Sequence, residues 1–301
     1  MKIYDCFTFY NEFELLELRL KSYYNLVDCF VIVEADKTFT NKPKPFYFNE
    51  RKNEFAEFLP KIRHIMVNMD IPYSGVGDWA IEFAQRDFIA KGLEDAAPED
   101  LVFISDLDEF WSPDIFQRLN ENRVEVFISY LPNPDIPRVN GAKIIIPCAP
   151  LTHVLNILES SPIVMDQNMH NYYLNWKTPQ IWQGSILTRF KRLTTPQQLR
   201  NLRTFIPRIR GGGWHFSYMG GVDRIISKMT NIVDGNEAVE KSGGKLIDRK
   251  HIEDSIKIGK SVYDTENTEN QFLPCDISEI NLPYISEFVK KYPQFLKTEG
   301  D

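Results

Sequence analysis

The sequence predicts an α/β fold in which helices flank a mostly parallel central sheet. The first observation is two unbroken apolar runs, residues 29–33 and 101–104, which are typical of strands buried on both faces. The second is their alternation with helix-spaced apolar residues over 13–27 and 79–93. The third is the length of 301 residues, enough for one sizeable core without a clear linker. We therefore expect a single unit, with residues 1–115 as one half and 116–301 as the other.

The first elements follow in order along the chain. Residues 2–9 form the expected first strand, and Asn11 with Glu14 is spaced as a capping box for the helix that follows. Residues 29–33 are the second strand, 38–48 a long connection with two prolines, and 62–67 the third strand. These segments predict the parallel part of the sheet.

The helix expected at residues 79–93 places Arg86 on its apolar stripe. A guanidinium group cannot lie on a core face without a partner. The partner could be Asp87 or Glu82 in a structural ion pair, or a phosphate or carbonyl of a ligand. Residues 101–105, the fourth strand, follow.

The second half is less regular. Residues 124–130 and 143–146 are expected strands, a helix starts near residue 112, and residues 282–296 form a last amphipathic helix. Asp223 is placed as the N-cap of another helix, and residues 242–278 are predicted to be rich in loops. The aromatic residues of 170–190 are interpreted as core in preference to a sugar platform.

An acidic cluster, Asp106, Asp108 and Glu109, directly follows the fourth strand. Parallel sheets bind ligands at the carboxyl ends of their strands, and the two aspartates point the same way. Such carboxylates suit a hard divalent cation that also binds phosphate oxygens. The alternative is an acidic turn that caps the next helix.

Composition limits the classes of partner and cofactor. With 35 Lys and Arg against 42 Asp and Glu, the net charge of −7 argues against general nucleic-acid binding. The four cysteines are scattered without a C-x-x-C pair, so we expect free thiols and no zinc. The sequence has no apolar run long enough to span a membrane and no signal peptide, which predicts a soluble, cytoplasmic protein.

A basic segment, residues 189–210, holds seven Lys or Arg and no acid. It is either a solvated face that pairs with acids elsewhere, or a site for an anionic ligand such as a diphosphate or an acidic acceptor. Three glycines at 211–213 follow, where a chain can adopt positive φ or approach a ligand closely. His215 lies beyond them on an expected short strand, where a structural role and metal ligation both remain open.

Several stretches in the same order together resemble glycosyltransferase family 17. They are FTFYNE at residues 7–12 with LLELRL at 15–20, VDCFVIVE at 27–34 with TFT at 38–40, QRD at 85–87, SDLDE at 105–109 and GWHFS at 213–217. The resemblance spans residue 2 to about 230. It implies a GT-A-type, Rossmann-like fold, with an acceptor-binding second half.

The resemblance also implies a reaction. The expected activity is inverting transfer of a sugar, N-acetylglucosamine as first choice, from a UDP-sugar to a glycan or glycolipid hydroxyl with Mn²⁺ or Mg²⁺. Carried over by position, Asp108 would hold the metal with His215, and Asp106 would contact the metal or the ribose. Donor-binding roles would fall to Phe9, Asn11, Glu34 and Arg86.

Inversion needs a carboxylate that takes the acceptor proton. Asp223 is the first choice for this base, with Glu109 and Glu237 as alternatives. Two other classes remain open: a sugar nucleotidyltransferase, which would usually have a Gly-rich loop after the first strand, and a non-catalytic glycan-binding protein. The latter would not need the paired aspartates or Arg86.

Overall fold

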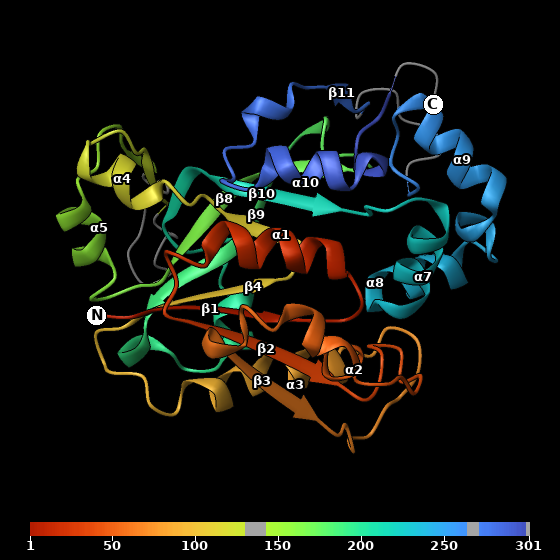
Figure 1. Ribbon diagram of the computed structural model, residues 1–301, viewed down its shortest axis with the longest axis horizontal. Helices are drawn as coiled ribbons and strands as arrows, with labels where there is room; N and C mark the ends of the chain where they lie inside the picture. Colours follow the sequence, from red (N-terminus) through yellow and green to blue (C-terminus); the bar gives the residue numbers. More distant parts are fainter. Residues whose placement is uncertain (130–142, 264–270, 299–301) are drawn as a thin grey trace, which may run out of the picture.

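The computed structural model describes residues 1–129, 143–263 and 271–298. Within these ranges, eleven strands form one sheet with helices around it (Figure 1). From one edge to the other the strands are β3 (Ile62–Val67), β2 (Cys29–Ala35), β1 (Ile3–Thr8), β4 (Leu101–Asp106), β9 (Trp176–Arg189), β8 (Ile163–Asn171), β10 (Arg208–Ser217), β6 (Val126–Ser129) and β7 (Lys143–Ile146), with β11 (Leu273–Pro274) paired to β9 and β5 (Glu109–Trp111) paired to β10.

The sheet is mixed, which corrects the prediction of a mostly parallel one. Strands β3, β2, β1 and β4 pair in parallel, as do β8 and β10. The pairs β4–β9, β8–β9, β6–β7, β6–β10, β5–β10 and β9–β11 are antiparallel. The physical reason is connection length, since only four residues join β8 to β9, too few for a parallel crossover. The α/β class itself is confirmed.

Ten α-helices surround the described part of this sheet. They are α1 (Phe13–Tyr23), α2 (Tyr47–Arg51), α3 (Ala80–Asp87), α4 (Ile115–Asn120), α5 (Leu151–Ile157), α6 (Pro196–Asn201), α7 (Val222–Asn231), α8 (Val233–Lys241), α9 (Arg249–Ile258) and α10 (Ile285–Lys291). The helix expected over 79–93 is α only in its first half and continues as the 3₁₀ segment η3 (Phe88–Leu93).

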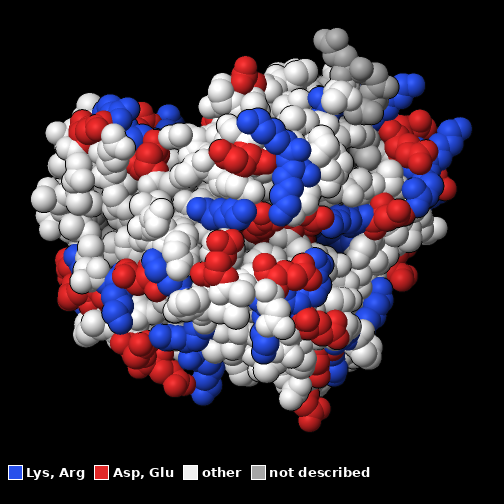
Figure 2. All heavy atoms as spheres, in the orientation of Figure 1, with Lys and Arg blue, Asp and Glu red and all other residues white. Residues whose placement is uncertain are grey.

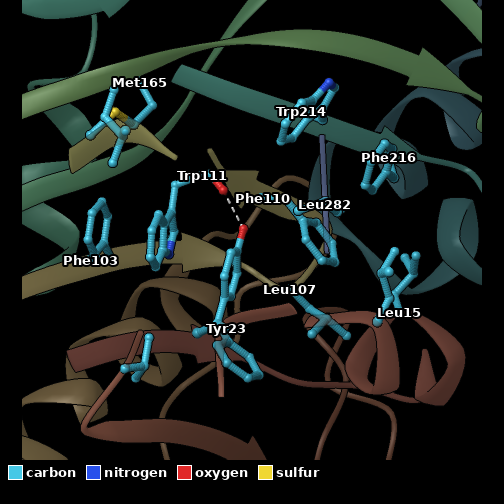
Figure 3. Packing of buried hydrophobic residues seen from close by; sticks show 14 of the residues in the cluster. Leu15, Tyr23, Phe103, Leu107, Phe110, Trp111, Met165, Trp214, Phe216 and Leu282 are labelled. Atoms are coloured by element: carbon cyan, nitrogen blue, oxygen red, sulfur yellow. Dashed lines mark hydrogen bonds between the residues drawn. The ribbon is translucent and has the colours of Figure 1, made fainter. Parts of the chain in front are cut away.

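The apolar runs are buried on both faces, as the sequence predicts. In β2, Phe30 and Ile32 join the larger core under α1 and α10, whereas Val31 and Val33 join a second core under α3 and η3. The larger core centres on Trp111, whose ring stacks on Tyr23 at 4.3 Å and on Phe103 at 4.2 Å (Figure 3).

Three local predictions are wrong. The N-cap of α1 is Glu12, because Asn11 makes no capping bond and Glu14 pairs with Arg224 at 2.7 Å. The N-cap of α7 is Gly221 with φ 87°, a conformation that suits glycine, so Asp223 lies in the first turn. The segment 242–278, predicted as loop, contains α9, capped by the Asp248 side chain.

The remaining predicted elements agree with the structure within a few residues, although Tyr130 of the predicted strand 124–130 lies outside the described residues. The four cysteines are free thiols, as expected. Throughout the described ranges, none of the helices combines the length and apolar character needed to cross a bilayer. Acidic and basic side chains are intermixed over the face shown in Figure 2.

The last helix is attached to the first through Glu17 on α1. The Glu17 carboxylate accepts hydrogen bonds from Lys291 and Tyr292, both at 2.7 Å, and pairs with Lys21 at 3.0 Å. Burial opposes ionisation of Glu17, but these donors outweigh it and lower its pKa to about 2. The ionised carboxylate therefore stabilises the docking of α10.

We predict that Glu17→Gln lowers the free energy of unfolding near neutral pH by on the order of 1–2 kcal/mol, since the partner lysines are partly exposed. Because the folded-state pKa lies below the usual 4.5, this contribution is complete above that value and is lost as the pH falls toward 2. Urea denaturation of the wild type and the variant across this pH range measures it. Glu57→Gln, at an exposed position, is the control. A wild-type-to-variant difference independent of pH would contradict the assignment.

Candidate active site

A cavity of about 610 Å³ opens at the edge of the sheet where β1, β4 and β10 end. These three strands run in the same direction, so their carboxyl ends meet there. The lining includes Phe9 after β1, Asp106 at the end of β4, Asp108 in the turn that follows, and His215 near the end of β10. The structure thus brings together four of the residues that the sequence singles out.

Arg19 of α1 anchors the acidic turn, residues 106–109, to the protein core. Its side chain is fully buried and forms a two-point ion pair with Asp5 of β1, both contacts at 2.7 Å. The same guanidinium donates to the Ser105 hydroxyl at 2.8 Å and to the carbonyl oxygens of Leu107 and Glu109 at 3.1 and 2.7 Å. The turn that carries the aspartates is therefore fixed by a core residue.

After this turn the chain reverses into β5, which pairs with β10 so that Glu109 lies opposite His215. The backbone N–H of Phe216 donates to the carbonyl of Asp108 at 2.9 Å. Gly213 is required here, because its φ is 147° and an added Cβ would lie 1.9 Å from the carbonyl oxygen of Phe110. We expected that the glycines at 211–213 could let the backbone approach a ligand closely. At Gly213 the backbone instead packs closely against β5.

Asp106 lies between two arginines. One oxygen accepts from Arg86 and the other from Arg200, each at 2.9 Å. Burial raises the pKa of Asp106, but the two guanidinium groups outweigh this effect and hold the pKa below its usual value. Arg86 also pairs with Glu82 at 2.9 Å, so the structural partner that we expected as one alternative is present, and Arg86 lines the cavity as well.

Asp108 points to the other side of the turn, where Lys228 of α7 donates to it at 2.6 Å. The Nε2 atom of His215 lies 3.4 Å from the same carboxylate oxygen. Burial raises the pKa of Asp108, but Lys228 and His215 outweigh it and lower the pKa overall. Asp108 is thus ionised at neutral pH and has one cationic and one imidazole neighbour.

Glu109 is fully buried and already engaged by several donors. Its carboxylate accepts from Arg200 at 2.5 and 2.8 Å, from the indole N–H of Trp182 at 2.6 Å, and from the backbone N–H of Asp106 at 3.1 Å. Through these contacts Glu109 holds Arg200 and Trp182 in position.

Four predicted or alternative site residues lie outside this cavity. Asn11 lines a separate depression, and the fully buried Glu34 accepts from the Phe48 backbone N–H at 2.9 Å and contacts His64 at 3.0 Å. Asp223 has an 83% exposed side chain paired with Arg249, and Glu237 pairs with Lys241 at 2.5 Å. The structure does not bring these four residues to the acidic turn.

The aromatic segment 170–190 divides between two roles. Tyr172 and Trp176 are buried in a third apolar cluster with α7 and α9, as the core interpretation predicts. Trp182 instead lines the cavity, where its ring stacks on His215 with a centroid separation of 4.9 Å.

Sequence reasoning missed several cavity residues, among them Glu12, Lys228 and Asp234. Glu12 could have been suspected, because it follows the first strand directly, as the acidic cluster follows the fourth. Lys228 and Asp234 carry no local signal, since only the packing of α7 and α8 places them at the sheet edge.

Two side chains of the cavity, Asp108 and His215, lie close enough together to bind one divalent ion. In the described ranges, no group of three or more His, Cys, Asp or Glu side chains is placed to hold a metal. The 3.4 Å between Asp108 and His215, however, is close to the roughly 3 Å expected between adjacent ligands at metal–ligand distances of about 2.1 Å. Magnesium sites commonly use one or two carboxylates with substrate phosphates, so the Asp108 carboxylate fits such an ion, whereas the His215 imidazole suits a transition metal better.

The model of glycosyltransferase family 17 matches residues 1–124. This match confirms the predicted family resemblance over that segment and supports the predicted enzyme class, glycosyltransferase. It includes Asp106 and Asp108 and ends before His215.

Three similar curated proteins are named as N-acetylglucosaminyltransferases. Over 129 residues the chain is 26% identical to the beta-1,4-mannosyl-glycoprotein 4-beta-N-acetylglucosaminyltransferases of Homo sapiens and Rattus norvegicus, and 25% identical to that of Mus musculus. The alignments cover 40% of this chain and 24% of each relative. The match thus spans about a quarter of the length of these proteins.

We predict that Arg19→Met lowers the free energy of unfolding by about 3–5 kcal/mol, because Asp5 is left as a buried carboxylate without its cation. Chemical denaturation measures this change. Arg51→Met is the matched control, since its ion pair with Glu54 is exposed and should contribute about 1 kcal/mol or less. Equal losses in the two variants would show that the buried pair has no special weight.

Proposed function

We propose that the protein transfers a sugar from a UDP-sugar donor to a glycan hydroxyl with inversion, and that N-acetylglucosamine is the sugar. The observation that carries the proposal is the placement of Asp106 and Asp108 at the carboxyl end of a buried parallel strand, on the floor of a large cavity. The volume of about 610 Å³ is within the usual range for small-ligand sites. The names of the similar proteins supply the choice of sugar.

We assign the metal to Asp108 and His215, and a supporting role to Asp106. Both carboxylate oxygens of Asp106 are occupied by Arg86 and Arg200, whereas Asp108 and His215 converge at the cavity wall. A bound Mn²⁺ or Mg²⁺ would supply Lewis-acid stabilisation of a leaving diphosphate. Lys228 neutralises Asp108 and is placed to meet phosphate oxygens close to it.

The proposed metal site can be tested through UDP binding. UDP is expected to bind on the order of 100-fold more tightly with Mn²⁺ than after chelation, because Asp108 and His215 would hold an ion whose charge attracts the diphosphate. Isothermal titration measures this without any need for turnover. Asp108→Asn should remove most of the metal effect. Equal UDP affinity before and after chelation would contradict the assignment of a metal to this site.

The acceptor base is proposed among the cavity carboxylates that lie outside ion pairs. Glu82, Asp106, Asp108 and Glu109 each pair with an Arg or Lys side chain. Among the remaining described carboxylates of the cavity lining are Glu12 and Asp234.

These two residues differ in environment. One oxygen of Glu12 accepts from the Asn11 backbone N–H at 3.0 Å, and burial raises the pKa of Glu12 despite the nearby Lys228. Asp234 is more exposed and accepts from the backbone N–H of Gly235 at 2.9 Å. A partly buried carboxylate with a raised pKa is suited to general-base work, so Glu12 is our first choice.

We predict that Glu12→Gln lowers kcat by about 100-fold or more, as expected for loss of a general base, while UDP affinity stays within a few-fold of the wild type. Steady-state kinetics and UDP titration test this, with Asp234→Asn as the comparison and Asp70→Asn, an exposed position, as the control. Loss of transfer in Asp234→Asn alone would move the role to Asp234. Loss only in Asp223→Asn would restore the sequence-based choice.

A further inference from the structure

Five of the seven cations in the basic segment 189–210 form ion pairs with acidic side chains. The paired residues fall into three groups: Arg189 and Lys191 with Glu99 and Glu159, Arg208 and Arg210 with Asp166 and Glu125, and Arg200 with Asp106 and Glu109. The interpretation of the segment as a face that pairs with acids elsewhere therefore explains these five. Arg192 is exposed to solvent and needs no partner.

Arg203 is the exception, because it lines the cavity and is only partly exposed. Across the described residues, no carboxylate lies within ion-pairing distance of its guanidinium. Its guanidinium carbon lies 4.7 Å from the centroid of the Trp182 ring, and Trp182 is itself fixed by its 2.6 Å bond to Glu109. The cation is thus held in place by a ring that cannot neutralise it.

The electrostatic setting is unfavourable for an isolated cation. Burial and the charge of Arg200 both lower the pKa of Arg203, although the charges of Glu109 and Asp106 partly oppose this. An arginine remains charged under these conditions, so it keeps a partly desolvated charge without a direct partner. An anionic ligand in the cavity would supply that partner, and a guanidinium suits the paired oxygens of a phosphate or carboxylate.

We propose that Arg203 binds an anionic group of the ligand, through phosphate or carboxylate oxygens. The identity of that ligand rests on the proposed function, which offers two sources: the diphosphate of the donor and an acidic group on the acceptor. Arg200, which the sequence groups with Arg203, is excluded from this role because Asp106, Glu109 and the Gly184 carbonyl already occupy it.

The test compares Arg203→Gln, Arg203→Lys and the control Arg192→Gln, which removes the same charge from an exposed position of the same segment. Calorimetric titration with inorganic pyrophosphate and with UDP reports the donor source. Nuclear magnetic resonance titration with methyl glucuronide and methyl glucoside reports the acceptor source. Thermal denaturation of each variant verifies that it is folded.

A loss of about 10-fold to 100-fold is expected for the anion that Arg203 binds, as for a charge-assisted contact. If Arg203→Gln weakens pyrophosphate and UDP, the source is the donor. If it weakens only methyl glucuronide, and not the neutral methyl glucoside, the source is an acidic acceptor. In either case Arg203→Lys should recover part of the affinity, and the wild-type affinity should fall with ionic strength.

Unchanged binding of all three anions by a folded Arg203→Gln variant overturns the inference, as does an equal loss in Arg192→Gln. The failure of the proposed function gives a different result. In that case the wild type transfers no sugar from any UDP-sugar, yet the titration with pyrophosphate or with methyl glucuronide still distinguishes wild type from Arg203→Gln.

Discussion

The buried ion pair between Arg19 and Asp5 is the interaction on which the candidate site depends. Removing two charges from water is unfavourable, and here the loss is offset by a two-point contact and by further acceptors for the guanidinium. Two of those acceptors are carbonyls of the acidic turn. Because the buried Arg19 fixes the backbone of the turn, the direction of each aspartate is set before a ligand binds.

This arrangement explains why neighbouring aspartates can have separate roles. Asp106 is directed toward Arg86 and Arg200, whereas Asp108 is directed toward Lys228 and His215. Two carboxylates held close together without cations would raise each other's pKa. Distributing cations on both sides keeps them ionised and leaves the site close to charge balance.

The first half of the fold could be predicted from the sequence, and the reason is local. Fully buried parallel strands need continuous apolar runs, and residues 29–33 and 101–104 display them directly. The second half could not, because β8 and β9 are long antiparallel strands whose pairing depends on distant partners. Caps failed for a similar reason, since Glu14 was drawn into an ion pair with Arg224 of α7.

The candidate site divides along the same line. Asp106, Asp108 and Arg86 were visible as a motif after a strand and as a charge on an apolar stripe. Lys228 was not, because a lysine on an amphipathic helix usually faces solvent. His215 was visible only as an isolated residue after three glycines, and its weight came from the resemblance. The structure then supplied the physical link, the pairing of β5 with β10.

The family match covers only part of the residues that line the cavity. Residues 1–124 contain the aspartates, Glu12 and Arg86, which form the part of the cavity nearest β1 and β4. His215, Lys228, Trp182 and Arg203 also line the cavity but lie beyond the match. The proposed reaction draws on both sets, because Asp108 lies inside the match whereas His215 and Lys228 lie beyond it. Arg203, a cavity cation for which the described residues supply no acidic partner, also lies beyond the match, so its proposed contact with an anionic ligand does not follow from the similar proteins.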